Sequence, residues 1–478
     1  MLLYELLSGL EYRLYGISGD ADISRPFSDS KNCVFAGLFV CLQGISFDGH
    51  DYAYEVKKKG ARACVALYPI EGFATVVVKD TRFALSVIWN NFYKRPTQSM
   101  RLFGITGTNG KTSTAAFLSA CLKESGRRVG TIGTLGVFFQ GERLEGECGH
   151  MTTPDPEYLY SSLAALRDMG ATDVVMEVSS HSVVQKRVDA LNFHTTVFTN
   201  LSPEHLDLHG TMEEYFRVKA SFVSRGVNRI VNGDDVYGRR FSQKVPSVSV
   251  GAADTSDVSV TPLGVSYTFL YKDKEMNIRS CVGGDFTLTN TMLAAACAAL
   301  VGVSTADIER GIASVKSIPG RLERVVRRED AGFDAFIDYA HTPAALEGVL
   351  LHLRRAVKGS LICVFGCGGE RDREKRPLMG ACAEALCDAV IVTGDNPRRE
   401  EPMAVIRDII KGMTGKNSVV IPDRREAIFV AVSMAGRGDI LLFAGKGHEN
   451  YEIVDTGVRP FDEKAIIKEA VRLKTAID

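Results

Sequence analysis

The feature that most constrains the fold is a glycine-rich stretch that follows a short apolar run beginning at Leu102. From Gly104 to Thr112 the sequence approximates the pattern G-x-x-x-x-G-K-[ST] of a phosphate-binding loop, or P-loop, with five residues instead of four between Gly104 and Gly110. The apolar run predicts a strand before the loop, and residues 113–125, stopped by Gly126, predict a helix after it. Because such a loop connects a strand to a helix, the sequence predicts an α/β fold around it.

The residue types in this loop suit phosphate chemistry. Glycines let backbone N–H groups close around phosphate oxygens, and the N-terminus of the following helix adds partial positive charge. Lys111 can reach the β- and γ-phosphates of a nucleotide, and the Thr112 hydroxyl can ligate Mg²⁺. The residues expected to contact the nucleotide here are Gly107, Thr108, Asn109, Gly110, Lys111, Thr112 and Ser113.

Chain length and net charge limit the kinds of protein that this sequence can encode. A chain of 478 residues is long enough for about three domains. The formal net charge of −1 gives no overall attraction to nucleic acid or to a membrane surface. No run of 18 apolar residues and no basic signal-peptide region occur, and the eleven cysteines contain no C-x-x-C pair. We therefore expect a cytoplasmic protein with free thiols, without membrane insertion or nucleic-acid binding.

The chain divides into three predicted units. Residues 1–97 are expected to form a small α/β domain, which a polar, proline-bearing linker joins to the P-loop unit, residues 98–321. Residues 322–478 alternate strand and helix and predict a largely parallel, Rossmann-like sheet. In such sheets ligands bind beyond the carboxyl ends of the strands. Four polar clusters lie at these ends, beginning at Asp338, Gly366, Asp395 and Gly445.

Three further residues of the central unit are candidates for metal chemistry. Glu177 closes an apolar run after the P-loop, a pattern that places an acid beside the phosphate site to hold Mg²⁺. His205 follows another predicted strand and could be a second metal ligand, although a solvated loop histidine is the alternative. Lys219 lies in a helix for which Thr211 is the predicted N-cap, and by default it would be a solvated lysine.

Taken together, these motifs resemble the Mur ligase family, which comprises ATP-dependent, amide-bond-forming enzymes of peptidoglycan synthesis. The resemblance covers the whole chain, and it implies a uridine-binding first domain, an ATP-binding central domain and a Rossmann-like C-terminal domain that binds an amino acid. The matching stretches are 107–112, 152–154, 177–181, 200–207, 338–343, 366–369, 375–380, 395–398 and 445–449.

The resemblance implies a role for each cluster. ATP phosphorylates the D-glutamyl carboxylate of UDP-N-acetylmuramoyl-L-alanyl-D-glutamate, and an amine then displaces phosphate from the acyl phosphate. Two Mg²⁺ ions are implied, with Thr112, Glu177 and His205 as ligands and Lys219 acting as a carbamate formed from CO₂. Lys111, Glu177, His205 and Lys219 are thus the implied catalytic set, and the protein is expected to act as a monomer on small molecules.

Binding residues follow in the same way. Those implied for ATP beyond the P-loop are Asn290, Arg321, Asp338 and His341. Those implied for the UDP-sugar dipeptide are Ser30, Ile45, Ser46, Phe47, Thr152, Thr153, Ser179, Gln185 and Arg187. The sequence departs from the family pattern at Lys31, Met151 and Thr287, where arginine, asparagine and asparagine are usual.

The amine substrate is expected to be meso-2,6-diaminopimelate. Diaminopimelate-adding members carry Asp-Asn-Pro-Arg, which this chain has at 395–398. An arginine pairs with the far carboxylate of that substrate and an acid with its far amine, whereas lysine or ornithine lacks the carboxylate. The implied contacts are Arg371, Asp395, Asn396, Pro397, Arg398, Gly445 and Glu449. Lysine, ornithine and a folylpolyglutamate synthase-like reaction remain the alternatives.

Overall fold

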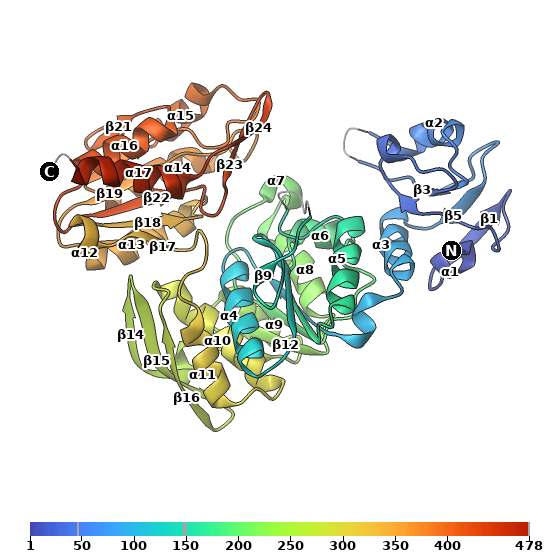
Figure 1. The fold of residues 1–478 in the computed structure, drawn as a ribbon, viewed down its shortest axis with the longest axis horizontal. Helices are drawn as coiled ribbons and strands as arrows, with labels where there is room; N and C mark the ends of the chain where they lie inside the picture. Colours follow the sequence, from blue (N-terminus) through green and yellow to red (C-terminus); the bar gives the residue numbers. More distant parts are fainter. Residues whose placement is uncertain (45–46, 147–150, 477–478) are drawn as a thin grey trace.

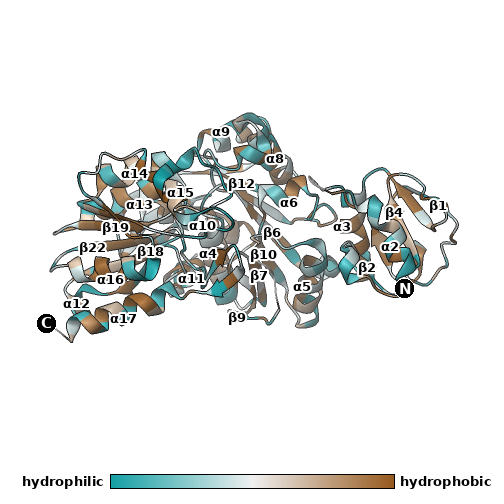
Figure 2. Cartoon of the chain, turned by 90° about the horizontal axis from the view of Figure 1, so that it is seen from above, coloured by the Kyte–Doolittle hydropathy of each residue, from teal (hydrophilic) through white to brown (hydrophobic). Residues whose placement is uncertain are grey.

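A computed structural model describes residues 1–44, 47–146 and 151–476. Figure 1 shows three bodies, with the first and last sheets on opposite sides of a larger central one. Helix α3 lies between the first sheet and the central one in both Figure 1 and Figure 2. The α/β fold predicted from the P-loop is confirmed, and each of the three main sheets is largely parallel.

The first body is a five-stranded sheet of order β1-β5-β4-β3-β2, in which only β1 runs antiparallel to its neighbour. Its strands are β1 (Tyr12–Tyr15), β2 (Pro26–Phe27), β3 (Leu38–Val40), β4 (Ala63–Ala66) and β5 (Thr75–Val78). Its helices are α1 (Leu3–Leu6), α2 (Ala53–Lys58) and α3 (Thr81–Phe92), with 3₁₀ turns η1 (Ser30–Asn32), η2 (Gly49–Tyr52) and η3 (Pro96–Ser99).

The central body is an eight-stranded sheet of order β13-β12-β11-β6-β10-β7-β8-β9. Its strands are β6 (Arg101–Thr106), β7 (Val129–Gly133), β8 (Gly136–Phe139), β9 (Glu142–Arg143), β10 (Asp173–Glu177), β11 (Thr195–Phe198), β12 (Asn228–Asn232) and β13 (Val248–Val250). Its helices are α4 (Lys111–Glu124), α5 (Pro156–Asp168), α6 (Ser180–Val184), α7 (Leu206–His209), α8 (Met212–Val223) and α9 (Val236–Ser242).

A three-stranded antiparallel sheet and two helices complete this body. They are η4 (Ala252–Asp254), β14 (Thr255–Thr261), β15 (Gly264–Tyr271), β16 (Lys274–Ser280), α10 (Asp285–Leu300) and α11 (Thr305–Ser314). Helices α10 and α11 pack against α4, so the helix that follows the P-loop is covered on its outer side.

The third body is a six-stranded sheet of order β17-β18-β22-β19-β20-β21, with only β17 antiparallel. Its strands are β17 (Glu323–Val326), β18 (Asp334–Asp338), β19 (Leu361–Phe365), β20 (Ala389–Val392), β21 (Ser418–Val420) and β22 (Ile440–Ala444), and β23 (Tyr451–Val454) and β24 (Gly457–Pro460) form a separate hairpin. Its helices are α12 (Arg328–Ala331), α13 (Pro343–Ala356), α14 (Lys375–Leu386), α15 (Pro402–Ile410), α16 (Arg424–Met434) and α17 (Glu463–Thr475).

Burial on both faces explains why the central strands are apolar throughout. In β6, Leu102 packs into the core on one side of the sheet, while Phe103 and Ile105 pack into the core on the other. A parallel sheet covered by helices on both faces favours continuous apolar runs rather than alternation. In Figure 2 the covering helices, such as α17, carry both hydrophobic and hydrophilic stretches. The polar residues that remain for chemistry therefore lie at the strand ends.

The sequence located most of these strands, and the differences have local causes. The predicted helix over 51–59 begins as the 3₁₀ turn η2, and the predicted helix from Asn290 starts five residues earlier, at Asp285. The antiparallel strands β1 and β17 and the hairpin β23–β24 were not predicted. Strands β1 and β24 are largely exposed, so their sequences lack the apolar runs that identify buried strands.

Gly104 in β6 offers a test of the packing beneath the P-loop. A Cβ atom at Gly104 would lie 2.5 Å from Phe222 Cζ and 2.7 Å from Phe193 Cε1. We expect Gly104→Ala to lower the free energy of unfolding by about 1–3 kcal/mol, because overpacking strains a dense core. Gly348→Ala is the control, since this exposed site in α13 has no atom within 4 Å of an added Cβ. It should stabilise the protein by up to about 1 kcal/mol. Urea unfolding followed by circular dichroism measures both, and equal stability of the two variants would contradict the packing.

Candidate nucleotide and substrate site

At two positions of the P-loop the backbone conformation, and the close approach of neighbouring residues, leave no room for a side chain. Gly107 has φ +153°, and a Cβ atom there would lie 1.8 Å from Thr199 Oγ1. Gly110 has φ +82°, and its Cβ would lie 2.4 Å from Asn290 Oδ1. Both contacts come from other elements, so the loop is enclosed by β11 and α10 as well as by its own strand and helix. Asn290, implied for ATP contact, thus lies directly against the loop.

Lys111 is the first residue of α4 and curls back over the loop. Its Nζ donates to the carbonyl oxygens of Gly107 at 2.9 Å and Thr108 at 2.7 Å. Burial lowers the pKa of Lys111, while the nearby carboxylates of Glu204 and Glu177 oppose this shift. The ammonium therefore lies where the phosphates of a nucleotide would meet the helix N-terminus.

Thr112 and Glu177 lie side by side, because β6 and β10 are neighbouring parallel strands. The Thr112 hydroxyl donates to Glu177 Oε2 at 2.9 Å. The Thr134 amide and hydroxyl also donate to this carboxylate, at 2.9 Å and 3.0 Å. Glu177 is only 3% exposed, and these three hydrogen bonds satisfy a carboxylate that burial would otherwise destabilise. Sequence reasoning did not single out Thr134, since it ends a plain strand–turn segment.

Lys219 is buried beside the P-loop and is not a solvated helix lysine. Its Nζ donates to the Gly107 carbonyl oxygen at 2.9 Å and lies 4.8 Å from the centre of the Tyr215 ring. Burial and the nearby Lys111 ammonium lower the pKa of Lys219 well below its ordinary value. The amine is thereby biased toward its neutral, nucleophilic form.

His205 lies at the start of α7 with a left-handed backbone, φ +55°. Burial lowers its pKa to about 4, although Glu204 opposes the shift. At neutral pH its imidazole is therefore uncharged and can offer a nitrogen lone pair. The His181 ring packs edge-on against it, with ring centres 4.7 Å apart. Sequence reasoning gave His181 no role of its own.

The C-terminal body reaches this cleft through two side chains. Arg321 Nη2 donates to the Thr112 hydroxyl at 3.2 Å. His341 Nε2 lies 2.9 Å from Glu204 Oε1, while its Nδ1 donates to the Tyr339 carbonyl oxygen at 2.8 Å. Burial opposes ionisation of Glu204, yet the hydrogen bond from His341 and the surrounding positive charges hold its pKa well below the ordinary value.

Glu204 joins the two bodies, and sequence reasoning gave it no role. It immediately precedes His205, and its carboxylate also lies 3.6 Å from His205 Nε2. Its position beside a candidate metal ligand was the one signal that could have identified it. Asp338, predicted for ATP, accepts a hydrogen bond from the Leu322 amide at 2.6 Å, and burial raises its pKa. Asp338 thereby fixes the chain next to Arg321.

Gly320 lies at the connection between the central and C-terminal bodies. Its φ is +66°, and a Cβ atom there would lie 2.2 Å from the His448 amide nitrogen. The connecting chain therefore runs directly against the polar loop 445–449 that follows β22.

The residues predicted for the amino acid gather at the carboxyl ends of β19, β20 and β22. Asn396 Nδ2 donates to Glu449 Oε2 at 2.7 Å, and Arg398 Nη1 donates to the Gly369 carbonyl oxygen at 2.7 Å. Burial raises the pKa of Glu449, and Asp395 adds to this shift. A Cβ atom at Gly445 would lie 2.5 Å from Asp395 Oδ2, so this approach requires glycine.

The remaining members of this set lie at the same edge of the sheet. The Pro397 carbonyl oxygen lies against Gly369, where a Cβ atom would come within 1.9 Å of it. Arg371 is exposed. Burial lowers the pKa of both Arg398 and His181, and the positive charge of Arg371 adds to each shift.

The residues predicted for the UDP-sugar dipeptide fall into two groups. The Thr153 hydroxyl donates to the Glu177 carbonyl oxygen at 3.0 Å and accepts from the Ser179 amide at 2.9 Å. Arg187 Nη1 donates to the Thr153 carbonyl oxygen at 2.6 Å, and Arg187 Nε donates to Gln185 Oε1 at 2.9 Å. Thr152 accepts from the Thr134 hydroxyl at 3.2 Å, which connects this group to the Glu177 site.

The second group lies in the first body. Ser30 is the first residue of η1, and Phe47 is exposed after β3. Ile45 and Ser46 lie outside the described residues. The first body is attached to the central one through α3. The Ser86 and Tyr160 hydroxyls, 2.7 Å apart, are one such connection.

The donor set beside the P-loop fits Mg²⁺ rather than a metal held entirely by protein. Within residues 1–44, 47–146 and 151–476, no three His, Cys, Asp or Glu side chains form a ready metal cage. Mg²⁺ is usually bound by one or two carboxylates together with substrate phosphates and water. The Thr112 hydroxyl, the Glu177 carboxylate and the neutral His205 imidazole match that requirement.

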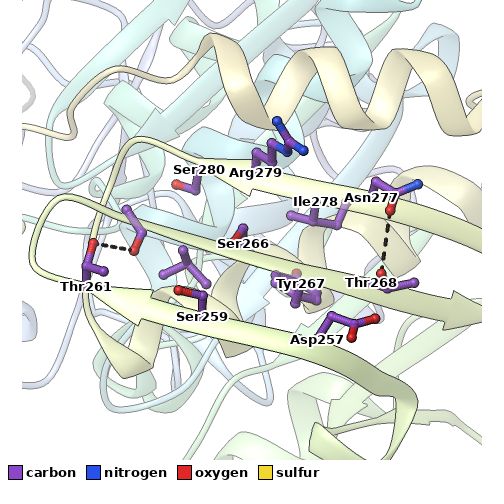
Figure 3. Close-up of a pocket in the computed structure, with 12 residues that line it drawn as sticks. Asp257, Ser259, Thr261, Ser266, Tyr267, Thr268, Asn277, Ile278, Arg279 and Ser280 are labelled. Atoms are coloured by element: carbon purple, nitrogen blue, oxygen red, sulfur yellow. Dashed lines mark hydrogen bonds between the residues drawn. The ribbon is translucent and has the colours of Figure 1, made fainter.

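A hollow of about 460 Å³ lies away from this cleft, on the outer face of the sheet β14–β16. Asp257, Ser266 and Arg279 are among the residues that line it (Figure 3). None of the predicted site residues borders it, so it is not part of the candidate site.

Among the described residues, no helix combines the length and the apolar character that a membrane-spanning segment requires.

Comparisons with known proteins agree with this geometry. A model described as the Mur ligase middle domain matches residues 105–298, and one described as the Mur ligase, glutamate ligase domain, matches residues 320–447. A UDP-N-acetylmuramoyl-L-alanyl-D-glutamate–2,6-diaminopimelate ligase from Clostridium tetani is 35% identical, covering 98% of this chain and 99% of its own. The ligase of the same name from Syntrophomonas wolfei is 38% identical, covering 99% of this chain and 100% of its own.

Solved structures give the same architecture. A 2,6-diaminopimelate ligase structure covers 99% of both chains with a TM-score of 0.69 and 27% identity. A folylpolyglutamate synthase from Mycobacterium tuberculosis shares the fold, with a TM-score of 0.64 and 20% identity, and covers 76% of this chain and 92% of its own.

Replacing Lys111 tests the phosphate-binding role of the loop. We expect Lys111→Met to weaken binding of an ATP analogue about 10- to 100-fold, since hydrogen bonds to charged groups contribute about 1.5–3 kcal/mol. Calorimetric titration measures the change. Lys123→Met is the control, because it removes the same charge from the exposed far end of α4. Equal effects of the two substitutions would contradict a specific role for Lys111.

Proposed function

Because the chain belongs to the Mur ligase family, we propose that it joins meso-2,6-diaminopimelate to UDP-N-acetylmuramoyl-L-alanyl-D-glutamate. The reaction consumes ATP, forms ADP and phosphate, and serves peptidoglycan precursor synthesis. The observation that carries the proposal is the meeting of three sets of groups. Thr112 and Glu204 lie in the cleft beside the P-loop, and Arg321 and His341 reach them from the C-terminal side. Tyr339 contacts both the His341 ring and Glu449, a residue proposed for the amino acid.

In the first step the D-glutamyl carboxylate attacks the γ-phosphorus of ATP. A phosphorus–oxygen bond forms to the carboxylate, the bond to the β-phosphate oxygen breaks, and ADP leaves. Catalysis of phosphoryl transfer is chiefly positioning and neutralisation of charge. Lys111 and the loop amides supply both, while Arg321 approaches from the opposite wall. When bound, Mg²⁺ would neutralise phosphate charge, held by Thr112, Glu177 and His205.

In the second step the amine of diaminopimelate attacks the acyl carbon. A carbon–nitrogen bond forms, the tetrahedral intermediate collapses, and phosphate leaves as the amine gives up a proton. Closure of the cleft around the substrates would shield the acyl phosphate from water. The contact between His341 and Glu204 lies at this closure, because each residue comes from a different body.

Lys219 is proposed to carry a carbamate that helps to hold a second Mg²⁺. A neutral amine adds to CO₂ and releases one proton, which leaves a carboxylate-like anion. The lowered pKa of Lys219, caused by burial and by Lys111, supports this chemistry. The anion would also offset the positive charge of the neighbouring Lys111.

The amino-acid pocket favours a substrate that carries both a carboxylate and an amine at its far end. Arg398 can pair with the carboxylate and Glu449 with the amine. Lysine or ornithine would leave Arg398 facing a cation. The first body would bind the uridine end of the other substrate through Ser30 and Phe47. We further propose a monomeric, cytoplasmic enzyme, consistent with the balanced net charge.

A substrate panel tests the reaction. Purified protein, ATP and the UDP-dipeptide are combined separately with diaminopimelate, lysine and ornithine, and phosphate release is measured. We expect release that requires both the dipeptide and diaminopimelate. Arg398→Ala should raise KM for diaminopimelate about 10- to 100-fold through lost charged hydrogen bonds, with KM for ATP unchanged. Arg399→Ala, at the exposed neighbouring position, is the control. Turnover confined to lysine or ornithine would overturn the choice of substrate.

Chemical rescue tests the carbamate. Lys219→Ala should lower kcat about 100-fold or more, since it removes an anion from the phosphoryl-transfer site. Formate or acetate should restore part of the activity by placing a carboxylate in the space left by the side chain. Lys219→Arg cannot form a carbamate and fills that space, so it should be inactive and not rescued. Full activity of Lys219→Ala would refute the proposal.

A further inference from the structure

Lys446 is a fully buried lysine that the reaction above does not use. It follows β22, and none of its side chain is exposed. Its Nζ donates to the Tyr451 carbonyl oxygen at 2.9 Å and to Asn396 Oδ1 at 3.2 Å. Two carboxylates lie just beyond hydrogen-bonding distance, Asp395 Oδ1 at 3.9 Å and Glu449 Oε2 at 4.0 Å. A buried ammonium is costly unless such partners surround it.

The Asn396 side chain receives its orientation from Lys446. Its Oδ1 accepts from both Lys446 Nζ and the Ile453 amide, the latter at 2.9 Å. An amide nitrogen cannot take that position, because it would face two donors. Asn396 Nδ2 must therefore point toward Glu449, to which it donates at 2.7 Å. The Lys446 ammonium therefore influences the position of Glu449 through the Asn396 side chain that lies between them.

Lys446 also connects the three segments that build the amino-acid pocket. It belongs to the loop after β22, it bonds to Asn396 in the loop after β20, and it bonds to the first residue of β23. The Ile453 carbonyl oxygen in β23 in turn accepts a hydrogen bond from the Arg398 amide at 3.0 Å. The positions of Arg398 and Glu449 on opposite sides of the pocket therefore both depend on contacts that Lys446 makes.

Charge balance gives the same conclusion. Asp395 and Glu449 repel each other in a buried pocket, and Asp395 adds to the raised pKa of Glu449 while Lys446 opposes that shift. Glu449 must be ionised to pair with a substrate ammonium. Lys446 Nζ lies within 4.0 Å of both carboxylates and is a buried cation.

We propose that Lys446 is a positioning residue that sets selectivity for a diamino dicarboxylic acid. It orients Asn396, and through Asn396 it holds Glu449 for the distal ammonium while Arg398 receives the distal carboxylate. The inference rests on the proposed function, since it concerns the same amino-acid pocket. Lys446 itself touches no substrate.

Kinetics of Lys446→Met test the inference, because methionine fills a similar volume without charge. We expect KM for diaminopimelate to rise about 10- to 100-fold, as for loss of a buried charged hydrogen bond. KM for ATP should change by less than about twofold. The ratio of kcat/KM for diaminopimelate to that for lysine should fall by a similar 10- to 100-fold. Equal changes in the KM of ATP and diaminopimelate, or none, would overturn the inference.

A double-mutant cycle separates positioning from general destabilisation. If Lys446 acts through Asn396, then Lys446→Met should add little to the effect of Asn396→Ala on KM for diaminopimelate. Additive effects would refute the route through Asn396. Arg324→Met is the matched control, because Arg324 is paired with Asp334 at the opposite end of the same sheet. It should leave both KM values unchanged.

A second variant and a measurement of the unmodified protein complete the test. If Lys446→Met does not fold, Lys446→Gln takes its place, since glutamine keeps a donor but removes the charge; it must show the same selective rise in KM. The unmodified protein is measured in the same assay. Failure of that protein to use diaminopimelate would overturn the proposed function. Normal use of diaminopimelate, together with a Lys446 variant whose KM for diaminopimelate is not selectively raised, would overturn only this inference.

Discussion

Positive charge held in a partly dry cleft is the constraint on which the rest of the structure depends. The Lys111 ammonium reaches the carbonyl oxygen of Gly107, and burial disfavours its charge. Lys219 reaches the same oxygen, and burial biases its amine toward the neutral form. The carboxylates of Glu177 and Glu204 offset part of this charge. A polyphosphate supplies the remaining negative charge, so the arrangement of the cations favours its binding before any contact with a base or sugar.

The same charges connect the separate bodies. Arg321 from the C-terminal side reaches Thr112, and His341 reaches Glu204, so these polar groups join the bodies alongside the apolar contact of Phe286 with the C-terminal core. Polar contacts of this kind can exchange one partner for another at small net cost, because the groups remain hydrogen-bonded in either state. A nucleotide that bound Arg321 in place of Thr112, or His341 in place of Glu204, would thus change the polar contacts between the bodies without exposing a hydrophobic core.

Local sequence patterns were sufficient for the P-loop, the strand that ends at Glu177 and the parallel C-terminal sheet, because buried strands carry continuous apolar runs. Lys219 could not be placed in this way, since a lysine in an amphipathic helix is ordinarily solvated and only its long-range contact with Gly107 buries it. Glu204 and Lys446 were passed over for a related reason. Their partners, His341 and Asn396, are distant in sequence, and spacing along one segment does not report such contacts.

The close approach of Gly320 to His448 gives the connection between the last two bodies an unusual geometry. At Gly320 the chain turns in contact with the loop 445–449, and Arg321 is the residue after Gly320. Any rotation about this turn carries Arg321 and the loop 445–449 together. The contact of Arg321 with Thr112 at the P-loop and the position of the loop 445–449 are thereby coupled through one turn.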